Sequence, residues 1–273
     1  MALPSDAPSL FDPATLEPSP PAAHTPSSPP AGVTRGLDPS RVERHRVERI
    51  DAVELLRALP SASVDLLVTD PAYESLEKHR AVGTTTRLKH SKASSNDWFH
   101  IFPNARFEEL FVEAYRVLKK NTHLYMYCDQ ETMFVAKPVA ERVGFKFWKP
   151  LVWDKRSIGM GYHYRSRYEL VLFFEKGKRK LASLSVPDIL EQPRVRGGYP
   201  SEKPPEVSEV LVRQSSAPGE LVVDPFAGSG SVGVASLRLG RRFIGGDICD
   251  EAVRIARARL DEVARLPVEG EAT

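Results

Sequence analysis

Hydrophobic and polar positions alternate along this chain in two rhythms, one typical of strands and one typical of helices. Residues 64–69 form a mostly apolar run, as expected of a strand that is buried on both faces. Residues 107–118 instead carry apolar side chains at helical spacing. The chain from residue 221 to 260 repeats the order strand, helix, strand, helix. This alternation predicts an α/β protein with a mostly parallel sheet.

The same patterns predict the remaining elements. Strands are predicted over residues 47–50, 64–69, 123–127, 145–153, 169–174, 221–224 and 242–246, and helices over residues 53–59, 107–118, 131–142, 205–214, 232–239 and 251–260. A doubly wound sheet of this class binds ligands beyond the carboxyl ends of its strands. Residues that directly follow a predicted strand are therefore the first candidates for a functional site.

Three regions depart from this rhythm. Residues 1–40 hold 10 of the chain's 23 prolines and cannot bury enough apolar surface to offset the entropy of ordering. We predict that they form a flexible tail, with a partner-binding arm as the alternative, and that residues 41–273 form one domain. Residues 74–106 and 155–200 are polar apart from one predicted strand, and loops of that length are usually functional or disordered.

Composition narrows the class of protein. The chain has 273 residues and a formal net charge of +2, and none of its apolar runs reaches the roughly 18 to 20 residues of a membrane span. Its two cysteines, Cys128 and Cys249, cannot build a disulfide scaffold or a four-cysteine zinc site. No metal-binding constellation stands out. These features favour a cytoplasmic protein without a metal centre.

A glycine-rich turn lies between a predicted strand and a predicted helix. It begins at Asp224, reads DPFAGSGSVG, and its glycines Gly228, Gly230 and Gly233 match the pattern GxGxxG. Glycines let the backbone approach a ligand, and Asp247, 19 residues after Gly228, suits hydrogen bonds to ribose hydroxyls. The pattern fits a nicotinamide dinucleotide, S-adenosylmethionine or a purely structural loop. Asp224 favours the sulfonium cofactor, because a carboxylate there attracts a cation and repels a pyrophosphate.

A second motif, Asp70-Pro71-Ala72-Tyr73, follows the apolar strand at residues 64–69. Its place beyond a strand end puts Asp70 and Tyr73 at a site rather than in the core. Proline fixes the backbone, so that the neighbouring carbonyl groups and the Tyr73 ring are presented rigidly. Taken alone, the motif is equally typical of an ordinary turn that ends a strand.

Together, the two motifs resemble those of the amino-methyltransferases of DNA, which produce N6-methyladenine or N4-methylcytosine. That family has a D/N/S-P-P-Y tetrapeptide and an F-x-G-x-G cofactor loop, and here the tetrapeptide precedes the loop, as in the permuted β group. The resemblance covers about residues 46–263. It implies a circularly permuted, seven-stranded type of sheet and S-adenosyl-L-methionine as the cofactor.

The resemblance also assigns roles to single residues. Lys203, in the segment Tyr199-Pro-Ser-Glu-Lys-Pro, is similar to a family lysine that helps hold the methionine end of the cofactor. The sequence departs from the family at Ala72, in place of the second Pro, at Tyr199, in place of His, and at Ser231, in place of the commoner Thr. The implied catalytic residues are Asp70, Pro71, Ala72 and Tyr73; the implied cofactor-binding residues are Asp51, Asp70, Lys203, Asp224, Phe226, Ala227, Gly228, Ser229, Gly230 and Asp247.

The proposed chemistry needs hydrogen-bond acceptors beside an amino group. The Asp70 carboxylate and the Pro71 carbonyl can each accept one N–H hydrogen bond, which directs the nitrogen lone pair at the sulfonium methyl. Tyr73 is expected to stack on the base, which must first leave the duplex. Methylation at cytosine C5 would need a cysteine nucleophile, but Cys128 and Cys249 lie in or beside apolar strand patterns and are predicted to be buried.

The two long insertions are basic and supply candidate contacts to double-stranded DNA. Residues 74–106 carry six basic and three acidic residues, and residues 146–200 carry 12 basic and five acidic residues. The alternative is an ordinary solvated charged face. The resemblance adds a second copy of the chain and a restriction endonuclease as candidate partners. The candidate DNA-binding residues are Arg87, Lys89, Lys92, Trp98, Tyr162, Tyr164, Arg165 and Arg167.

The sequence therefore predicts a DNA methyltransferase that acts on adenine N6. Asp70 at the head of the tetrapeptide favours adenine, because the cytosine-N4 enzymes of the family more often begin with Ser. Cytosine N4 is the alternative target, and protein-glutamine or RNA methylation fits the motif order less well. Two alternatives of other classes are a nicotinamide-dependent oxidoreductase built on the glycine-rich turn and a DNA-binding protein without activity.

Overall fold

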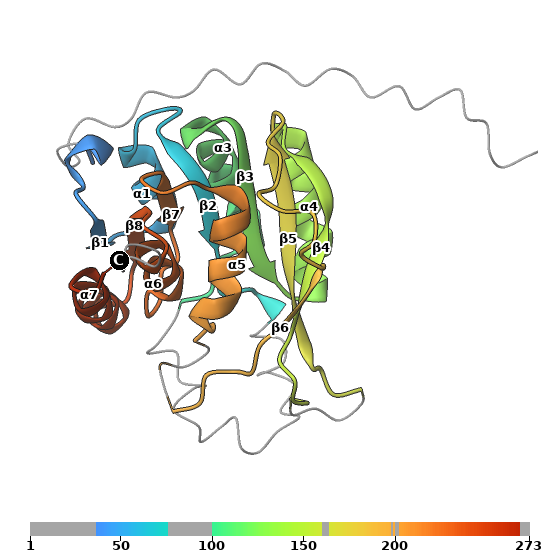
Figure 1. Cartoon of the computed structure of the whole chain (residues 1–273). Helices are drawn as coiled ribbons and strands as arrows, with labels where there is room; N and C mark the ends of the chain where they lie inside the picture. The colour runs from blue at the N-terminus through green and yellow to red at the C-terminus, as the bar shows by residue number, and fades with distance from the viewer. Residues whose placement is uncertain (1–36, 76–99, 160–163, 198, 200–201, 268–273) are drawn as a thin grey trace, which may run out of the picture. The chain divides into compact units, whose positions relative to one another are not determined.

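The computed structural model describes residues 37–75, 100–159, 164–197, 199 and 202–267. These residues form one eight-stranded sheet in the order β1-β8-β7-β2-β3-β5-β4-β6 (Figure 1). Within it, β5 is antiparallel to both of its neighbours, and all other neighbouring strands are parallel. The strands are β1 (His45–Arg49), β2 (Val64–Thr69), β3 (Leu118–Cys128), β4 (Lys146–Asp154), β5 (Tyr168–Lys176), β6 (Ile189–Glu191), β7 (Leu221–Asp224) and β8 (Arg242–Asp247).

Helices cover both faces of the sheet, as the doubly wound class requires. Helices α1, α3 and α4 pack on one face and α5, α6 and α7 on the other, each with its own cluster of buried apolar side chains (Figure 1). The helices are α1 (Ala52–Ala58), α3 (Phe107–Val117), α4 (Gln130–Val143), α5 (Pro205–Ser215), α6 (Ser231–Arg238) and α7 (Asp250–Ala264), with short 3-10 turns at Pro39–Arg41 and Asn104–Arg106. None of the helices in the described ranges combines the length and the apolar character that crossing a bilayer would need.

Strand β2 lies near the centre of the sheet, and every residue of it is buried. Its one charged side chain, Asp65, is 5% exposed and accepts hydrogen bonds from the Lys119 ammonium at 2.6 Å and from the Leu221 N–H at 2.9 Å. These partners offset the cost of burying a carboxylate. Because β2 pairs with both β7 and β3, the residue after it, Asp70, lies in the middle of the carboxyl edge.

The predicted α/β class and the parallel sheet are confirmed, and β2 and β7 have the predicted bounds. The prediction missed β6 (Ile189–Glu191), because three residues are too few to show a hydrophobic period. Strand β3 also begins five residues earlier than predicted, at Leu118. The packed domain includes residues 37–40, since Leu37 is 6% exposed and the Pro39 carbonyl accepts a hydrogen bond from Arg242. Residues 1–36 lie outside the described residues.

Candidate active site at the carboxyl edge of the sheet

Acidic side chains line one edge of the sheet. In a parallel sheet the carboxyl ends of the strands meet at the same edge, and the antiparallel β5 brings its first residues there. Some of these carboxylates are paired with lysine or arginine side chains, whereas the others leave a local negative potential that suits a cationic ligand. The acidic residues at this edge are Asp51 after β1, Asp247 at the end of β8, Asp224 at the end of β7, Asp70 after β2, Asp129 after β3, Glu169 at the start of β5 and Asp154 at the end of β4.

The glycine-rich turn is fixed by hydrogen bonds to two of these carboxylates. Asp224 accepts the N–H of Phe226 at 3.0 Å, and Asp247 accepts the N–H of Gly228 at 3.0 Å. Gly228 and Gly230 have φ angles of +50° and +83°, a region that only glycine adopts without strain. The turn that the sequence predicted therefore sits at the strand ends, with Asp224 and Asp247 as its anchors.

The third glycine of the pattern has a different task. A Cβ atom on Gly233 would lie 2.7 Å from the Phe243 ring and 2.8 Å from the Leu260 side chain. Gly233 therefore lets α6 pack closely between β8 and α7 and has no need to approach a ligand. Gly230 is required for two reasons. Its φ angle is positive, and an added Cβ would lie 3.1 Å from the Cβ of Ala256.

Burial shifts the titration of both anchors. Asp224 is 2% exposed, and burial raises its pKa well above the ordinary value, although the Phe226 N–H opposes the shift. Burial likewise raises the pKa of Asp247, against the N–H groups of Cys249 and Gly228. The negative charges of Asp70 and Asp247 add to the shift of Asp224. A bound cation would relieve this repulsion and stabilise the ionised carboxylates.

Asp70 is held by two side chains that come from different parts of the chain. The Tyr73 hydroxyl donates to Asp70 Oδ1 at 2.9 Å, and the Lys203 ammonium forms an ion pair with Asp70 Oδ2. Burial raises the pKa of Asp70, and the Lys203 charge opposes this shift. Tyr73 is 8% exposed, and its hydroxyl lies against Asp70. Stacking of the Tyr73 ring on a base stays a prediction.

Phe102 links the Asp-Pro-Ala-Tyr motif to the glycine-rich turn. Its N–H donates to the Ala72 carbonyl at 2.8 Å, and its ring meets the Phe226 ring edge-on at a centroid distance of 5.0 Å. The Asn104 N–H adds a bond to the Glu74 carboxylate at 2.7 Å. These contacts fix the backbone at Ala72, where this sequence lacks the second proline of the family motif. Sequence reasoning missed Phe102, because nothing in its local pattern points to a partner 30 residues away.

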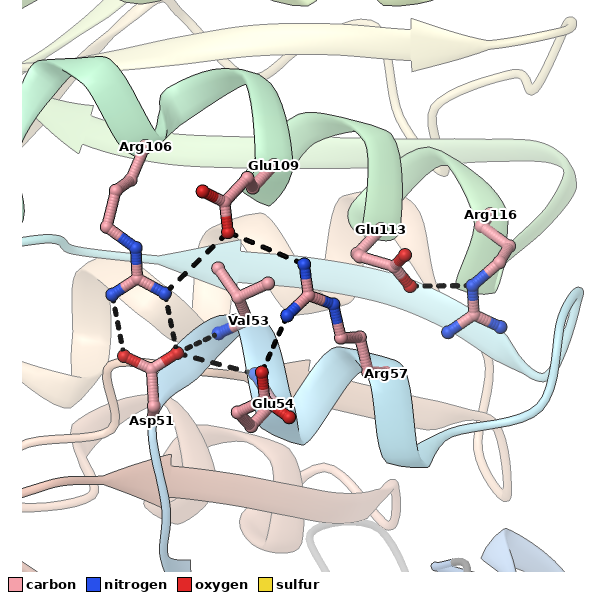
Figure 2. Close-up of polar contacts among 8 residues, drawn as sticks. All are labelled: Asp51, Val53, Glu54, Arg57, Arg106, Glu109, Glu113 and Arg116. Atoms are coloured by element: carbon pink, nitrogen blue, oxygen red, sulfur yellow. Dashed lines mark hydrogen bonds and ion pairs between the residues drawn. The ribbon is translucent and has the colours of Figure 1, made fainter. Parts of the chain in front are cut away.

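Asp51 is engaged on both sides (Figure 2). Its Oδ1 atom accepts the N–H of Val53 at 3.0 Å, which caps α1, and the Arg106 guanidinium binds both carboxylate oxygens at 2.8 and 2.9 Å. Burial alone would raise the pKa of Asp51, but Arg106 and the backbone N–H groups lower it. Arg106 also continues to Glu109, at 4.0 Å, in the network between α1 and α3. A cofactor bound by Asp51, as predicted, would therefore contact carboxylate oxygens that already accept hydrogen bonds from Arg106.

The candidate DNA-binding residues are only partly within the described ranges. Tyr164 is fully exposed, and the Arg165 side chain donates to the Gly159 carbonyl at 2.7 Å. Arg167 makes a bidentate pair with Asp154, at 2.6 Å to each oxygen, at the base of the loop between β4 and β5. Its guanidinium is therefore neutralised in part. Arg87, Lys89, Lys92, Trp98 and Tyr162 lie outside the described residues.

The two cysteines differ from each other. Cys128 is fully buried, and burial raises the pKa of its thiol, as a structural thiol requires. Cys249 is half-buried at the start of α7, next to Asp247, so the prediction that both are buried is wrong for Cys249. It lies between two exposed residues, Ile248 and Asp250, at the point where the chain enters α7.

Known proteins resemble this chain in sequence. The sequence profile of the family described as DNA methylase matches residues 64–258 of the chain. The DNA adenine methyltransferase YhdJ of Escherichia coli (strain K12) is 28% identical, over 86% of this chain and 89% of its own length.

Solved structures share the fold. M1.HpyAVI in complex with SAM aligns with a TM-score of 0.59 at 20% identity, covering 79% of this chain and 100% of its own. The PvuII DNA methyltransferase, which is cytosine-N4-specific, aligns with a TM-score of 0.62 at 16% identity, covering 82% and 92%. YhdJ, an adenine methyltransferase, is thus similar to this chain in sequence, and the cytosine-N4-specific PvuII enzyme is similar to it in fold.

Proposed function

Because this chain belongs to the DNA methylase family, we propose that it transfers the methyl group of S-adenosyl-L-methionine to the N6 amino group of adenine in double-stranded DNA. The family membership establishes a DNA methyltransferase of the N6-adenine and N4-cytosine class. The cofactor site, the target base and the catalytic residues are the proposal. The observation that carries it is the adjacency of β2 and β7, whose ends present Asp70 beside the glycine-rich turn.

The donor side of the site consists of Asp224, Asp247 and the turn between Phe226 and Gly230. Its residues fit S-adenosylmethionine because buried carboxylates with raised pKa values gain from a cationic sulfonium and ammonium. A nicotinamide dinucleotide would bring a pyrophosphate into the same negative field, and nothing supports that alternative. When bound, the cofactor supplies an electrophilic methyl group.

The acceptor side consists of Asp70, Pro71 and Tyr73. The Asp70 carboxylate and the Pro71 carbonyl accept the two N–H hydrogens of the adenine amino group and so free the nitrogen lone pair. That lone pair forms the new N–C bond while the electrons of the S–C bond return to sulfur. The methylated nitrogen then carries a positive charge and passes one proton to solvent by way of the Asp70 carboxylate, which accepts its N–H hydrogen bond. Tyr73 orients the Asp70 carboxylate through their 2.9 Å hydrogen bond.

The target base is proposed from the motif and from the relatives. The leading Asp70 and the adenine methyltransferase YhdJ support adenine N6. The likeness of the fold to a cytosine-N4 enzyme makes cytosine N4 the alternative, with the same chemistry on another amino group.

Contact with DNA is proposed for the loop between β4 and β5. This loop begins beside Asp154 at the same edge as Asp70 and presents the exposed Tyr164 and the basic Arg165. Basic side chains would bind phosphates, and an exposed ring can stack on an unpaired base. A reaction on the cell's own DNA places the enzyme in the cytoplasm. A second copy of the chain and a restriction endonuclease are proposed partners.

Incubation with methyl-labelled S-adenosylmethionine and mixed-sequence DNA, followed by digestion to nucleosides, tests the proposal. We expect the label in N6-methyladenine. Label in N4-methylcytosine would move the proposal to the alternative base, and no transfer by a protein that binds both DNA and cofactor would overturn it. Asp70→Ala is expected to abolish transfer while cofactor binding remains measurable.

A further inference from the structure

Four charged side chains form a continuous chain at the acceptor side, and two of them have no role in the proposed reaction so far. Lys155 Nζ lies 2.5 Å from Glu169 Oε1, Glu169 Oε2 lies 3.3 Å from Lys203 Nζ, and Lys203 pairs with Asp70. The charges alternate along this order, and the four cancel. The exposed fractions of the four side chains lie between 11% and 26%, so the charges interact with little screening by solvent.

The fold delivers these residues from separate segments. Glu169 stands opposite Trp153 in the ladder between β4 and β5, one position before Leu170, which pairs with Cys128 at the end of β3. Lys155 directly follows β4, and Lys203 precedes α5 with its ammonium 5.4 Å from the centre of the Tyr127 ring. Glu169 therefore lies between the two lysines because β4 pairs with β5.

Glu169 is ionised and holds the Lys203 charge in place. Burial alone would raise the pKa of Glu169, but the ammonium groups of Lys203 and Lys155 lower it. Burial alone would also lower the pKa of Lys203, but Asp70 and Glu169 raise it. Lys203 is thus shared between two carboxylates and is not committed to Asp70 alone. The Glu169 charge in turn raises the pKa of Asp70.

Other groups also face Asp70 and set its background. The Tyr73 hydroxyl donates to it, and the negative charge of Asp70 acts on Tyr127 and Cys128 at the end of β3 and on Asp224 at the end of β7. Among the described residues around Asp70, Lys203 is the cation that pairs with it directly. A group that moves or holds the Lys203 ammonium therefore changes the electrostatic environment of the Asp70 carboxylate.

Building on the proposed function, we propose that Glu169, itself neutralised by Lys155, is a positioning residue for the methyl transfer. It shares the Lys203 ammonium with Asp70 and holds it in place, so that Asp70 keeps an oxygen available for the target amino group. Without Glu169, the ammonium would pair with Asp70 alone and compete with the substrate for its oxygens.

The test is the pH profile of kcat/KM for DNA in three proteins. In Glu169→Gln, Asp70 loses a like charge and keeps Lys203 to itself, so the acid limb should move to lower pH by about 0.5 unit, while kcat falls about tenfold. In Lys203→Met, Asp70 loses its cation, so the acid limb should move to higher pH. Opposite displacements support the proposal; an unmoved limb, or displacement in the same direction, overturns it.

Two controls separate positioning from folding. Glu209→Gln removes a carboxylate of α5 that pairs with Arg238 of α6 at 2.9 Å and has no contact with the four charged side chains, and we expect the wild-type profile from it. If Glu169→Gln does not fold, Lys155→Met alters the same four charges from the other end. Without Lys155, Glu169 attracts the Lys203 ammonium more strongly and draws it from Asp70, so the acid limb should move to higher pH. An unmoved limb in this variant also overturns the proposal.

A measurement without turnover keeps this inference distinct from the proposed function. The ¹³C NMR signal of the Asp70 carboxyl carbon reports its titration directly in the wild type and in Glu169→Gln. A lower midpoint in the variant supports the positioning role even if the wild type methylates no DNA. An identical midpoint overturns the role, whatever the wild type does with DNA.

Discussion

On the donor side of the site, backbone N–H groups hold the carboxylates, whereas on the acceptor side lysine side chains hold them. Asp224 and Asp247 bond to N–H groups of their own turns or of the neighbouring turn. Asp70 and Glu169 pair with Lys203 and Lys155, which come from other segments. A backbone-held carboxylate is fixed by a short motif, while a lysine-held carboxylate depends on the whole fold and on charge balance.

The energetic consequence also differs. Within the described residues, no lysine or arginine forms an ion pair with Asp224 or Asp247, and burial raises the pKa values of both carboxyls. That side is prepared for an external cation. The acceptor side contains its own cations, so Glu169 stays charged and Lys203 stays protonated. A substrate amino group can then be bound there as a neutral hydrogen-bond donor.

The largest effect is expected from Asp70→Asn, which breaks the acceptor side. The amide loses the charge that binds Lys203 and accepts hydrogen bonds less strongly. We expect kcat to fall about 10² to 10⁴-fold, while calorimetry still detects cofactor binding. A variant with wild-type kcat would show that Asp70 has no part in the mechanism. The acceptor side would then not be the catalytic side of the site.

Gly230→Ala tests whether the donor side depends on backbone shape. Residue 230 has a φ of +83°, and an added Cβ would lie 3.1 Å from the Cβ of Ala256. Gly219→Ala is the control, because φ there is +80° and nothing lies within 4 Å of the added Cβ. Urea denaturation should show a loss of about 2 to 3 kcal/mol for Gly230→Ala and about 1 kcal/mol for Gly219→Ala. Equal losses would mean that close packing at Gly230 contributes nothing.

Asp224→Asn separates the charge of the donor side from its shape, because the amide oxygen can still accept the Phe226 N–H. Cofactor affinity measured by calorimetry should fall about tenfold. The stability should change in the opposite direction. Because the pKa of Asp224 is raised in the folded protein, its ionisation costs stability as the pH rises through that value.

The melting temperature of Asp224→Asn should therefore exceed that of the wild type at pH 8, and the difference should shrink toward acidic pH. A variant that is less stable at every pH would show that the Asp224 charge supports the fold. The opposing changes in affinity and stability are what distinguish a charge kept for a ligand from a charge kept for folding.

The smallest effect is expected from the network between α1 and α3 (Figure 2). Arg106→Ala removes a bidentate pair with Asp51 in which both side chains are 32% exposed, and should cost about 1 kcal/mol of stability. Arg57→Ala removes more exposed pairs to Glu54 and Glu109 and should cost less than about 0.5 kcal/mol. Thermal unfolding compares the two, and equal costs would show that the pair with Asp51 has no special weight.

The comparison also explains what could be read from the sequence. Asp224, Asp247 and Asp70 could be predicted to lie at the carboxyl edge because each one ends or directly follows a predicted strand. Glu169 and Lys155 were not predicted as site residues, because their roles arise from the pairing of β4 with β5. Phe102 was also missed, since its contacts reach back to Ala72 and forward to Phe226.

The central claim is that the donor side and the acceptor side form a single site, and a crystal structure with S-adenosylhomocysteine tests it most directly. The account predicts the ligand's ribose near Asp247, its amino-acid end near Asp224 and its sulfur facing Asp70. A ligand bound away from the glycine-rich turn, or with its sulfur turned from Asp70, would contradict it.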